Sequence, residues 1–227
     1  MLIFIATMRR NNGLHAHIAK RHSFTAFAIL RLLCYNIFIK KIKAAQPRER
    51  NDIMNEAMRV LTGRRSVRKY LSRPVPEEAL EQIIQAGLYA PSAMGKQPCQ
   101  LIVVEDKETR DQLSRMNAAV MNGSGDPFYG APVVIIVLSD LDIAGCPVRD
   151  GSLVMGNLLN AAFAVGVDSC WINRAEEMFN TDEGKALLKK WGLNGRYQGI
   201  GCCILGYRDG NLPAPRPRRE GTVTRIK

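Results

Sequence analysis

The chain has 227 residues with 32 Lys and Arg, 21 Asp and Glu and a formal charge of +11. Residues 1–48 hold nine Lys and Arg and no acid, and the other 23 basic residues face all 21 acids, which leaves residues 49–227 at +2. This balance excludes a strongly basic nucleic-acid-binding body. All three histidines, His15, His17 and His22, lie in the N-terminal region, so the rest of the chain has no His-dependent catalytic triad or His-ligated zinc site.

An apolar segment lies within the basic N-terminal region. Residues 24–39 span about 16 positions, fewer than the ~20 that a membrane-spanning helix needs. Three interpretations are open: a membrane anchor with basic flanks, a transit-type peptide, and an upstream segment that is not part of the protein. We expect residues 1–53 to lie outside the fold, and we expect no membrane partner.

From residue 55 onward, apolar residues at helical spacing alternate with short apolar runs that are typical of buried strands. Helices are expected from Pro76 and over residues 55–62, 107–121, 151–167 and 181–191. Strands are expected over residues 100–105, 133–138, 169–172 and 199–205. This alternation favours a sheet with helices on both faces. The segment from Asn211, which is rich in Pro and Arg, is expected to be extended.

Two of these elements are apolar enough to be interior. Residues 133–138 are apolar throughout and mostly β-branched, which predicts a strand covered on both faces. Residues 151–167 hold no charged side chain, so this helix is expected to be buried nearly all round, at the centre of the fold or in a dimer interface. Asp150 is expected to cap its N-terminus.

Four short segments carry candidate chemistry. Residues 64–70 (Arg-Arg-Ser-Val-Arg-Lys-Tyr) gather three arginines and a hydroxyl where a helix gives way to a loop, an arrangement suited to a phosphate. Residues 90–98 (Ala-Pro-Ser-Ala-Met-Gly-Lys-Gln-Pro) form a loop broken by Pro and Gly before a strand. The other two are Cys-Trp-Ile-Asn-Arg at 170–174 and Pro-Arg-Pro-Arg at 215–218.

In their order and spacing, these segments resemble the nitroreductase family of FMN-dependent oxidoreductases, from about Met54 to the C-terminus. The resemblance implies an α+β (α/β-like) fold, a central mixed β-sheet flanked by helices, in an intertwined homodimer. Residues 54–227 would be the FMN-binding domain. Because the family's domain normally begins just before its Arg-Arg-Ser motif, we favour the interpretation that residues 1–53 are not part of the protein.

The resemblance also implies how the two ends of the domain hold the phosphate. Arg64 matches the arginine that contacts the phosphate, and Arg65 follows it in the same motif. Ser66 matches a hydroxyl that contacts the ribityl chain or the ring, and Arg68 matches a basic position near N1 and O2 of the flavin. Near the C-terminus, Arg216 and Arg218 match a basic pair that closes on the phosphate.

Other matched residues would lie against the flavin ring. Those expected to come from the other subunit are Pro91, Ser92, Ala93 and Met94, and those expected to cross the ring from the same subunit are Trp171, Ile172 and Asn173. By position, Asn173 would bring a backbone N–H to N5, and Trp171 is equally well read as a core aromatic. Gly95 stands where Asn is usual and Cys99 where Trp is frequent, which affects the expected substrate preference more than flavin binding.

The expected activity is hydride transfer from NADH or NADPH to flavin N5 and then to a nitroaromatic, quinone or similar small-molecule acceptor. The flavin would carry the chemistry, with no catalytic side chain and no metal. Residues 199–201 (Gly-Ile-Gly) are not a dinucleotide fingerprint. Two alternatives stay open: a same-fold enzyme with reductive dehalogenation or flavin fragmentation chemistry, and a flavin-binding protein without turnover. Six cysteines without a C-x-x-C pair are typical of a reducing compartment, so a cytoplasmic location is expected.

Overall fold

The computed structural model describes residues 50–227, so the expectations for residues 24–39 and for most of the N-terminal region lie outside the described residues. Residues 55–227 form one compact unit. Within the described part, none of the helices combines the length and the apolar character that crossing a bilayer requires.

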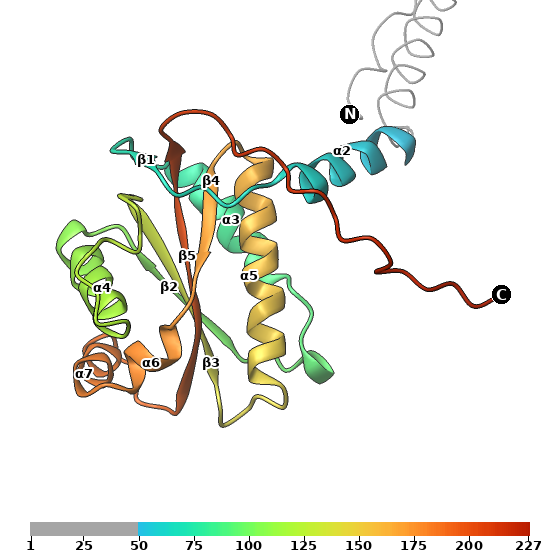
Figure 1. Ribbon diagram of the computed structural model, residues 1–227. Helices are drawn as coiled ribbons and strands as arrows, with labels where there is room; N and C mark the ends of the chain where they lie inside the picture. The colour runs from blue at the N-terminus through green and yellow to red at the C-terminus, as the bar shows by residue number, and fades with distance from the viewer. Residues whose placement is uncertain (1–49) are drawn as a thin grey trace, which may run out of the picture. The chain divides into compact units, whose positions relative to one another are not determined.

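A five-stranded sheet forms the middle layer of this unit (Figure 1). Its strands are β1 (Tyr70–Leu71), β2 (Cys99–Val104), β3 (Val133–Asp140), β4 (Asp168–Ile172) and β5 (Tyr197–Arg208). The order is β1-β5-β3-β2, and β4 also pairs with β5. Each ladder among the described strands is antiparallel, and the parallel contribution is a single bridge between Ser66 and Ser169.

Helices cover both faces of the sheet, as the sequence predicted. The helical elements are α2 (Arg50–Gly63), α3 (Glu77–Leu88), the short 3-10 turn η1 (Ala93–Gly95), α4 (Lys107–Ala119), α5 (Pro147–Ala164), α6 (Ala175–Asn180) and α7 (Asp182–Lys190). Helices α3 and α5 lie on one face, and α4, α6 and α7 lie on the other (Figure 1).

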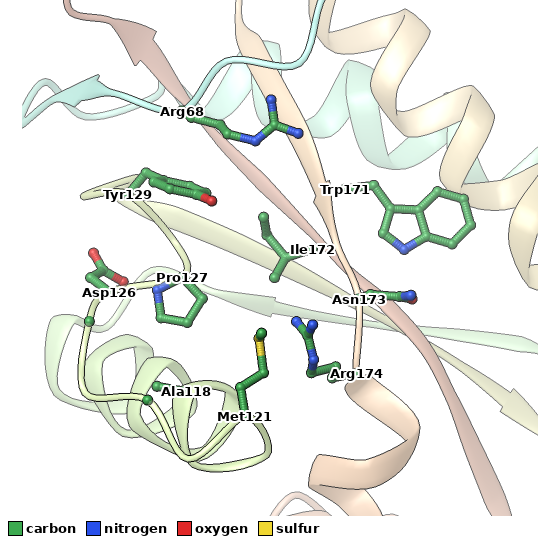
Figure 2. A pocket seen from close by; sticks show the side chains of 12 residues that line it. Arg68, Ala118, Met121, Asp126, Pro127, Tyr129, Trp171, Ile172, Asn173 and Arg174 are labelled. Atoms are coloured by element: carbon green, nitrogen blue, oxygen red, sulfur yellow. The ribbon is translucent and has the colours of Figure 1, made fainter.

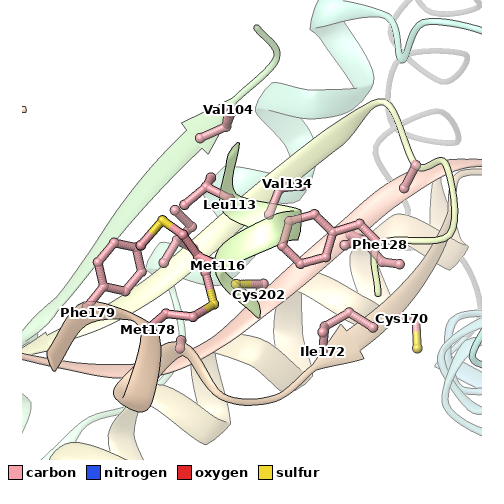
Figure 3. Packing of buried hydrophobic residues seen from close by; sticks show 14 of the residues in the cluster. Val104, Leu113, Met116, Phe128, Val134, Cys170, Ile172, Met178, Phe179 and Cys202 are labelled. Atoms are coloured by element: carbon pink, nitrogen blue, oxygen red, sulfur yellow. The ribbon is translucent and has the colours of Figure 1, made fainter. Parts of the chain in front are cut away.

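Strand β3 separates two apolar cores. Its residues are buried from Val133 to Ser139, which confirms the prediction of a strand covered on both faces. Successive side chains point to opposite faces of a strand, so Ile135 packs with α3 and α5 while Ile136 packs with α4, α6 and α7. Figure 3 shows the second core, where methionines of α4 and α6 meet Phe128, Phe179 and Cys202.

The predicted cap of α5 is wrong. The helix begins at Pro147, a favoured first position, and Cys146 precedes it. Asp150 therefore lies inside the first turn, where it is buried, and its Oδ1 accepts a hydrogen bond from the backbone N–H of Ala93 at 2.9 Å. The carboxylate precedes the uncharged run in the sequence, as a cap would, but it holds a distant loop instead.

The uncharged helix is also less covered within one chain than the sequence predicted. Leu153 is 47% exposed and Val148 53% exposed on α5. The buried side of the helix contacts the sheet closely, because a Cβ added at Gly151 would lie 2.4 Å from Cγ1 of Ile200. Helix α5 thus packs on the sheet along one side and leaves apolar side chains on the other.

Candidate functional site

Strand β4 brings two of the four candidate segments together. One edge of β4 pairs with β5, and the chain that leaves α2 lies along its other edge. The backbone N–H of Val67 donates to the carbonyl of Ser169 at 3.1 Å. This contact places the segment that begins at Arg64 beside the strand that ends in residues 171–173.

A cavity of about 480 Å³ opens where these segments meet (Figure 2). A volume of this size is typical of small-molecule sites. Four of the predicted residues line it, and the rest of the wall comes from the end of α4, from the α4–β3 loop (residues 120–132) and from Arg174. In full, the lining is Arg68, Ala118, Met121, Gly123, Gly125, Asp126, Pro127, Tyr129, Trp171, Ile172, Asn173 and Arg174.

The first two arginines of the 64–70 segment have different surroundings. One guanidinium nitrogen of Arg64, Nη1, is buried and has no hydrogen-bond partner among the described residues. Nη1 of Arg65 donates to the carbonyls of Thr62 and Arg64, both at 2.8 Å, and so holds the end of α2, while its Nε is buried without a partner. A buried guanidinium donor without a partner is costly, and an anion would satisfy it.

The end of β4 is held by a buried side chain of α4. Nδ2 of Asn117 donates to the carbonyl of Asn173 at 2.7 Å, and the side chain is completely buried. Arg174 follows in the left-handed conformation at φ 77°, where the chain turns from β4 into α6. The peptide between Asn173 and Arg174 therefore has a fixed position.

One carboxylate organises the α4–β3 loop. Asp126 accepts hydrogen bonds from Nη2 of Arg110 and Oγ of Ser114, both at 2.6 Å, and from the backbone N–H groups of Phe128 and Gly130 at 2.9 and 2.7 Å. Burial by itself raises the pKa of Asp126, but these hydrogen bonds outweigh it, so the pKa lies below its usual range.

The network around Asp126 also fixes Tyr129. This residue has φ 54°, which is unfavourable for a non-glycine side chain, and it lies between two hydrogen-bonded residues of the loop. Figure 2 shows its ring at the side of the cavity, across from Ile172. Sequence reasoning missed Tyr129 and gave Arg174 no role beyond its place in the 170–174 segment, since neither has a spacing or composition that signals a left-handed conformation.

The structure does not bring the loop that contains Pro91, Ser92, Ala93 and Met94 to this cavity within one chain. The loop lies between α3 and β2, near the N-terminal end of α5 (Figure 1). Its backbone is left-handed at Met94, Gly95 and Gln97, and Met94 is 82% exposed. Asp150 therefore holds a loop that presents an apolar side chain outward.

Cys99 follows the same loop and is half-buried. Burial, followed by the nearby Asp150 carboxylate, raises the pKa of the Cys99 thiol to about 11. The thiol is protonated at neutral pH, so Cys99 is a packing residue here and not a nucleophile.

The C-terminal pair, Arg216 and Arg218, lies in the extended tail after β5. Both side chains are exposed, and neither lines the cavity. The tail itself carries no helix or strand after Arg208, as the sequence predicted.

Comparisons with known proteins agree with this arrangement. A family model described as "Nitroreductase family" matches residues 61–124. A relative from Archaeoglobus fulgidus, named "Putative NADH dehydrogenase/NAD(P)H nitroreductase", is 33% identical over 161 residues, which cover 68% of this chain and 86% of the relative. An NADPH-flavin oxidoreductase from Vibrio harveyi is 26% identical over 189 residues, which cover 75% of this chain and 72% of that protein.

A solved structure shares the fold. A nitroreductase with bound FMN from Bacteroides fragilis superposes with a TM-score of 0.70 and 27% identity, over 76% of this chain and 99% of the other. The likeness therefore spans the described body of the chain and includes both segments that meet at the cavity.

Proposed function

This chain belongs to the nitroreductase family, and on that basis we propose that it is an FMN-dependent oxidoreductase that takes electrons from NADH or NADPH and delivers them to a small-molecule acceptor. One observation carries the proposal. Arg68 and Trp171–Asn173, which are far apart in the sequence, line one cavity beside β4, and Ser66 pairs with that strand through Ser169. The family and the fold class that the sequence resemblance implied are confirmed.

The residues present fit FMN. A phosphate dianion needs cationic donors, and Arg64 has a buried guanidinium nitrogen without a partner. A flat ring needs an apolar surface, and the Ile172 side chain supplies one on the cavity side of β4, while the Trp171 ring lies on the other side of the strand (Figure 2). Arg68, exposed at the cavity, would balance negative charge near N1 and O2.

When bound, FMN would supply the two-electron redox chemistry between NADH or NADPH and the acceptor. The chain's own residues bind and orient it. Arg64 and Ser66 would hold the phosphate and ribityl end, and Asn117 keeps the backbone at Asn173 in place for the ring. In this proposal no side chain acts as a general base.

The Pro91–Met94 loop supports a homodimer, which we also propose. Large apolar side chains are exposed around this loop and on α5, including Tyr89 at 84%, Leu88, Met94, Val148 and Leu153. Contiguous exposed apolar residues mark interaction surfaces. A second copy would cover them and bring the loop to the partner's flavin, while Arg216 and Arg218 would close on the phosphate.

The domain boundary and location follow from the same proposal. We place the whole FMN-binding domain in residues 54–227, since residues 55–227 form a compact unit without the preceding chain. The five described cysteines are free thiols, which suits the cytoplasm.

Two measurements on the purified protein test the proposed function. Titration of the apoprotein with FMN should quench flavin fluorescence with saturation. The loaded protein should then oxidise NADH or NADPH when a quinone or a nitroaromatic compound is added. Saturable FMN binding without oxidation of either donor would favour a flavin-binding protein without turnover, and the absence of FMN binding would contradict the proposal as a whole.

A further inference from the structure

The cavity has a second wall that the proposed flavin contacts do not use. It consists of Met121, Pro127 and Tyr129 from α4 and the α4–β3 loop, together with Arg174 at the end of β4. In Figure 2, Arg68 and Arg174 lie on opposite sides of Ile172, and the Tyr129 ring lies between them at the side. With Arg68 assigned to the flavin, Arg174 is the cation that remains in the second wall.

Glu176 and Glu177 lie near Arg174 at the start of α6, but neither forms an ion pair with it. Within residues 55–227, its guanidinium forms no ion pair and no side-chain hydrogen bond, although it is only half-exposed. Glu176, in the next helix, instead accepts a hydrogen bond from Gln198 at 3.0 Å. Asp126, the acid that lines the cavity, is paired with Arg110 at 2.6 Å. The cavity therefore has a net positive character.

The position of Arg174 is fixed from both sides. The carbonyl of Asn173 is held by Asn117, and Ala175 is buried at the start of α6. Arg174 itself has φ 77°, a conformation that costs an L-residue steric energy and persists only where its surroundings impose it. The fixed backbone determines which part of the cavity the Arg174 guanidinium can reach.

The rest of the second wall is apolar and suits a flat ring. Met121 is a polarisable side chain that adapts to aromatic surfaces, and Pro127 and Tyr129 add flat faces. The wall thus combines an apolar surface with one unneutralised cation.

We propose that Arg174 selects electron acceptors that carry a carboxylate or a similar anionic group on an aromatic or quinonoid ring. This inference rests on the proposed function and specifies the acceptor class of the same site. The ring packs against Met121 and Pro127, and the anionic group pairs with the Arg174 guanidinium.

The test compares two acceptors of nearly the same shape, 4-nitrobenzoate and neutral 4-nitrobenzamide, with the FMN-loaded protein. The wild type should show a higher kcat/KM for the carboxylate. Arg174→Gln should lower the carboxylate-to-amide ratio by roughly tenfold to a hundredfold, which is the range for one charge-assisted contact. Arg196→Gln is the matched control, since it removes an exposed arginine that pairs with Asp142 outside the cavity, and its ratio should equal that of the wild type.

A second readout needs no turnover. Benzoate should bind the oxidised, loaded protein with an affinity that falls with added salt, and Arg174→Gln should weaken this binding by the same factor. FMN content is measured for each variant, so that loss of flavin is not mistaken for loss of selectivity. If Arg174→Gln does not fold, Arg174→Asn replaces it, because Asn tolerates the left-handed conformation.

The outcomes separate the two proposals. If the protein binds no FMN or oxidises no NADH or NADPH, the proposed function fails. If both acceptors are reduced but the carboxylate-to-amide ratio is the same in the wild type and in Arg174→Gln, the selectivity proposal is overturned and the function stands. An increase in the KM for NADH or NADPH in Arg174→Gln, with an unchanged acceptor ratio, would mean that Arg174 binds the phosphates of the hydride donor. This result would also overturn the selectivity proposal.

Discussion

Arg64 combines a buried guanidinium nitrogen without a partner and a position beside β4. If this donor meets the FMN phosphate, Arg64→Ala removes a charge-assisted hydrogen bond worth about 1.5–3 kcal/mol. The dissociation constant for FMN should then rise roughly tenfold to a hundredfold in a fluorescence titration of the apoprotein. Arg196→Ala, on the exposed surface, should leave it unchanged. Equal affinities for the wild type and Arg64→Ala would remove Arg64 from the site.

A second single residue, Asp126, makes the stability of the folded protein depend on pH. Its pKa is lower in the folded protein than in the unfolded chain, so its stabilising contribution is complete above the unfolded pKa of about 3.9 and is lost as the pH falls through the folded pKa. Asp126→Asn should lower the free energy of unfolding by about 1–3 kcal/mol at pH 7. This range is smaller than for a fully buried ion pair, because the Asp126 side chain is 37% exposed.

Urea denaturation of the wild type and Asp126→Asn at pH 7 and near pH 3 checks this prediction. The difference in unfolding free energy between the two proteins should shrink at the lower pH, because the carboxylate of the unfolded chain takes up a proton before that of the folded protein. A difference that does not change with pH would mean that Asp126 contributes by shape and packing alone.

Among the elements, α5 offers a matched pair of glycines. A Cβ at Gly151 would lie 2.4 Å from Ile200, whereas a Cβ at Gly156 would meet no atom of the described chain within 4 Å. Gly151→Ala should therefore push α5 away from β5 and cost about 1–3 kcal/mol of stability. Gly156→Ala should avoid that cost. Thermal unfolding of both variants tests the packing of α5, and equal melting temperatures would contradict it.

Apolar periodicity was sufficient to predict the long elements of the fold. The strand at 133–138 and the helices at 107–121 and 181–191 are present with small shifts at their ends. A strand buried on both faces and a helix buried along one side each leave a clear pattern of apolar residues in the sequence. Strand β1 and helix α6 were not predicted, since two and six residues are too few to carry a period. Asp150 was misplaced because its partner, Ala93, is 57 positions away.

The candidate site was predictable only in part, because contacts between residues far apart in the sequence hold some of its residues in place. Arg68 and Trp171–Asn173 carry a family pattern, and the structure places them at one cavity. Tyr129 and Arg174 reach that cavity through left-handed backbone conformations: Asp126 holds the loop around Tyr129, and Asn117 of α4 holds Asn173 beside Arg174. The contact between Asn117 and Asn173 spans 56 positions and leaves no local signal in the sequence.

At the scale of the whole molecule, the proposed dimer predicts that stability depends on protein concentration. Apolar side chains on α5 and around Met94 are exposed in one chain, and a second copy that covers them would stabilise the folded form by mass action. Melting temperature should therefore rise with protein concentration, and sedimentation should show a dimer. A flavin-loaded monomer with a concentration-independent melting temperature would contradict the dimer.

The absorbance spectrum of the purified protein, recorded without oxygen before and after NADH or NADPH is added, tests the central claim most directly. A member of this family whose Arg64–Arg68 segment and β4 end hold FMN should be yellow, or become yellow with added FMN. One of the two nicotinamide donors should then bleach it, and a nitroaromatic or quinone acceptor should restore the colour. A protein that stays colourless with added FMN, or a yellow protein that neither donor bleaches, would contradict the account.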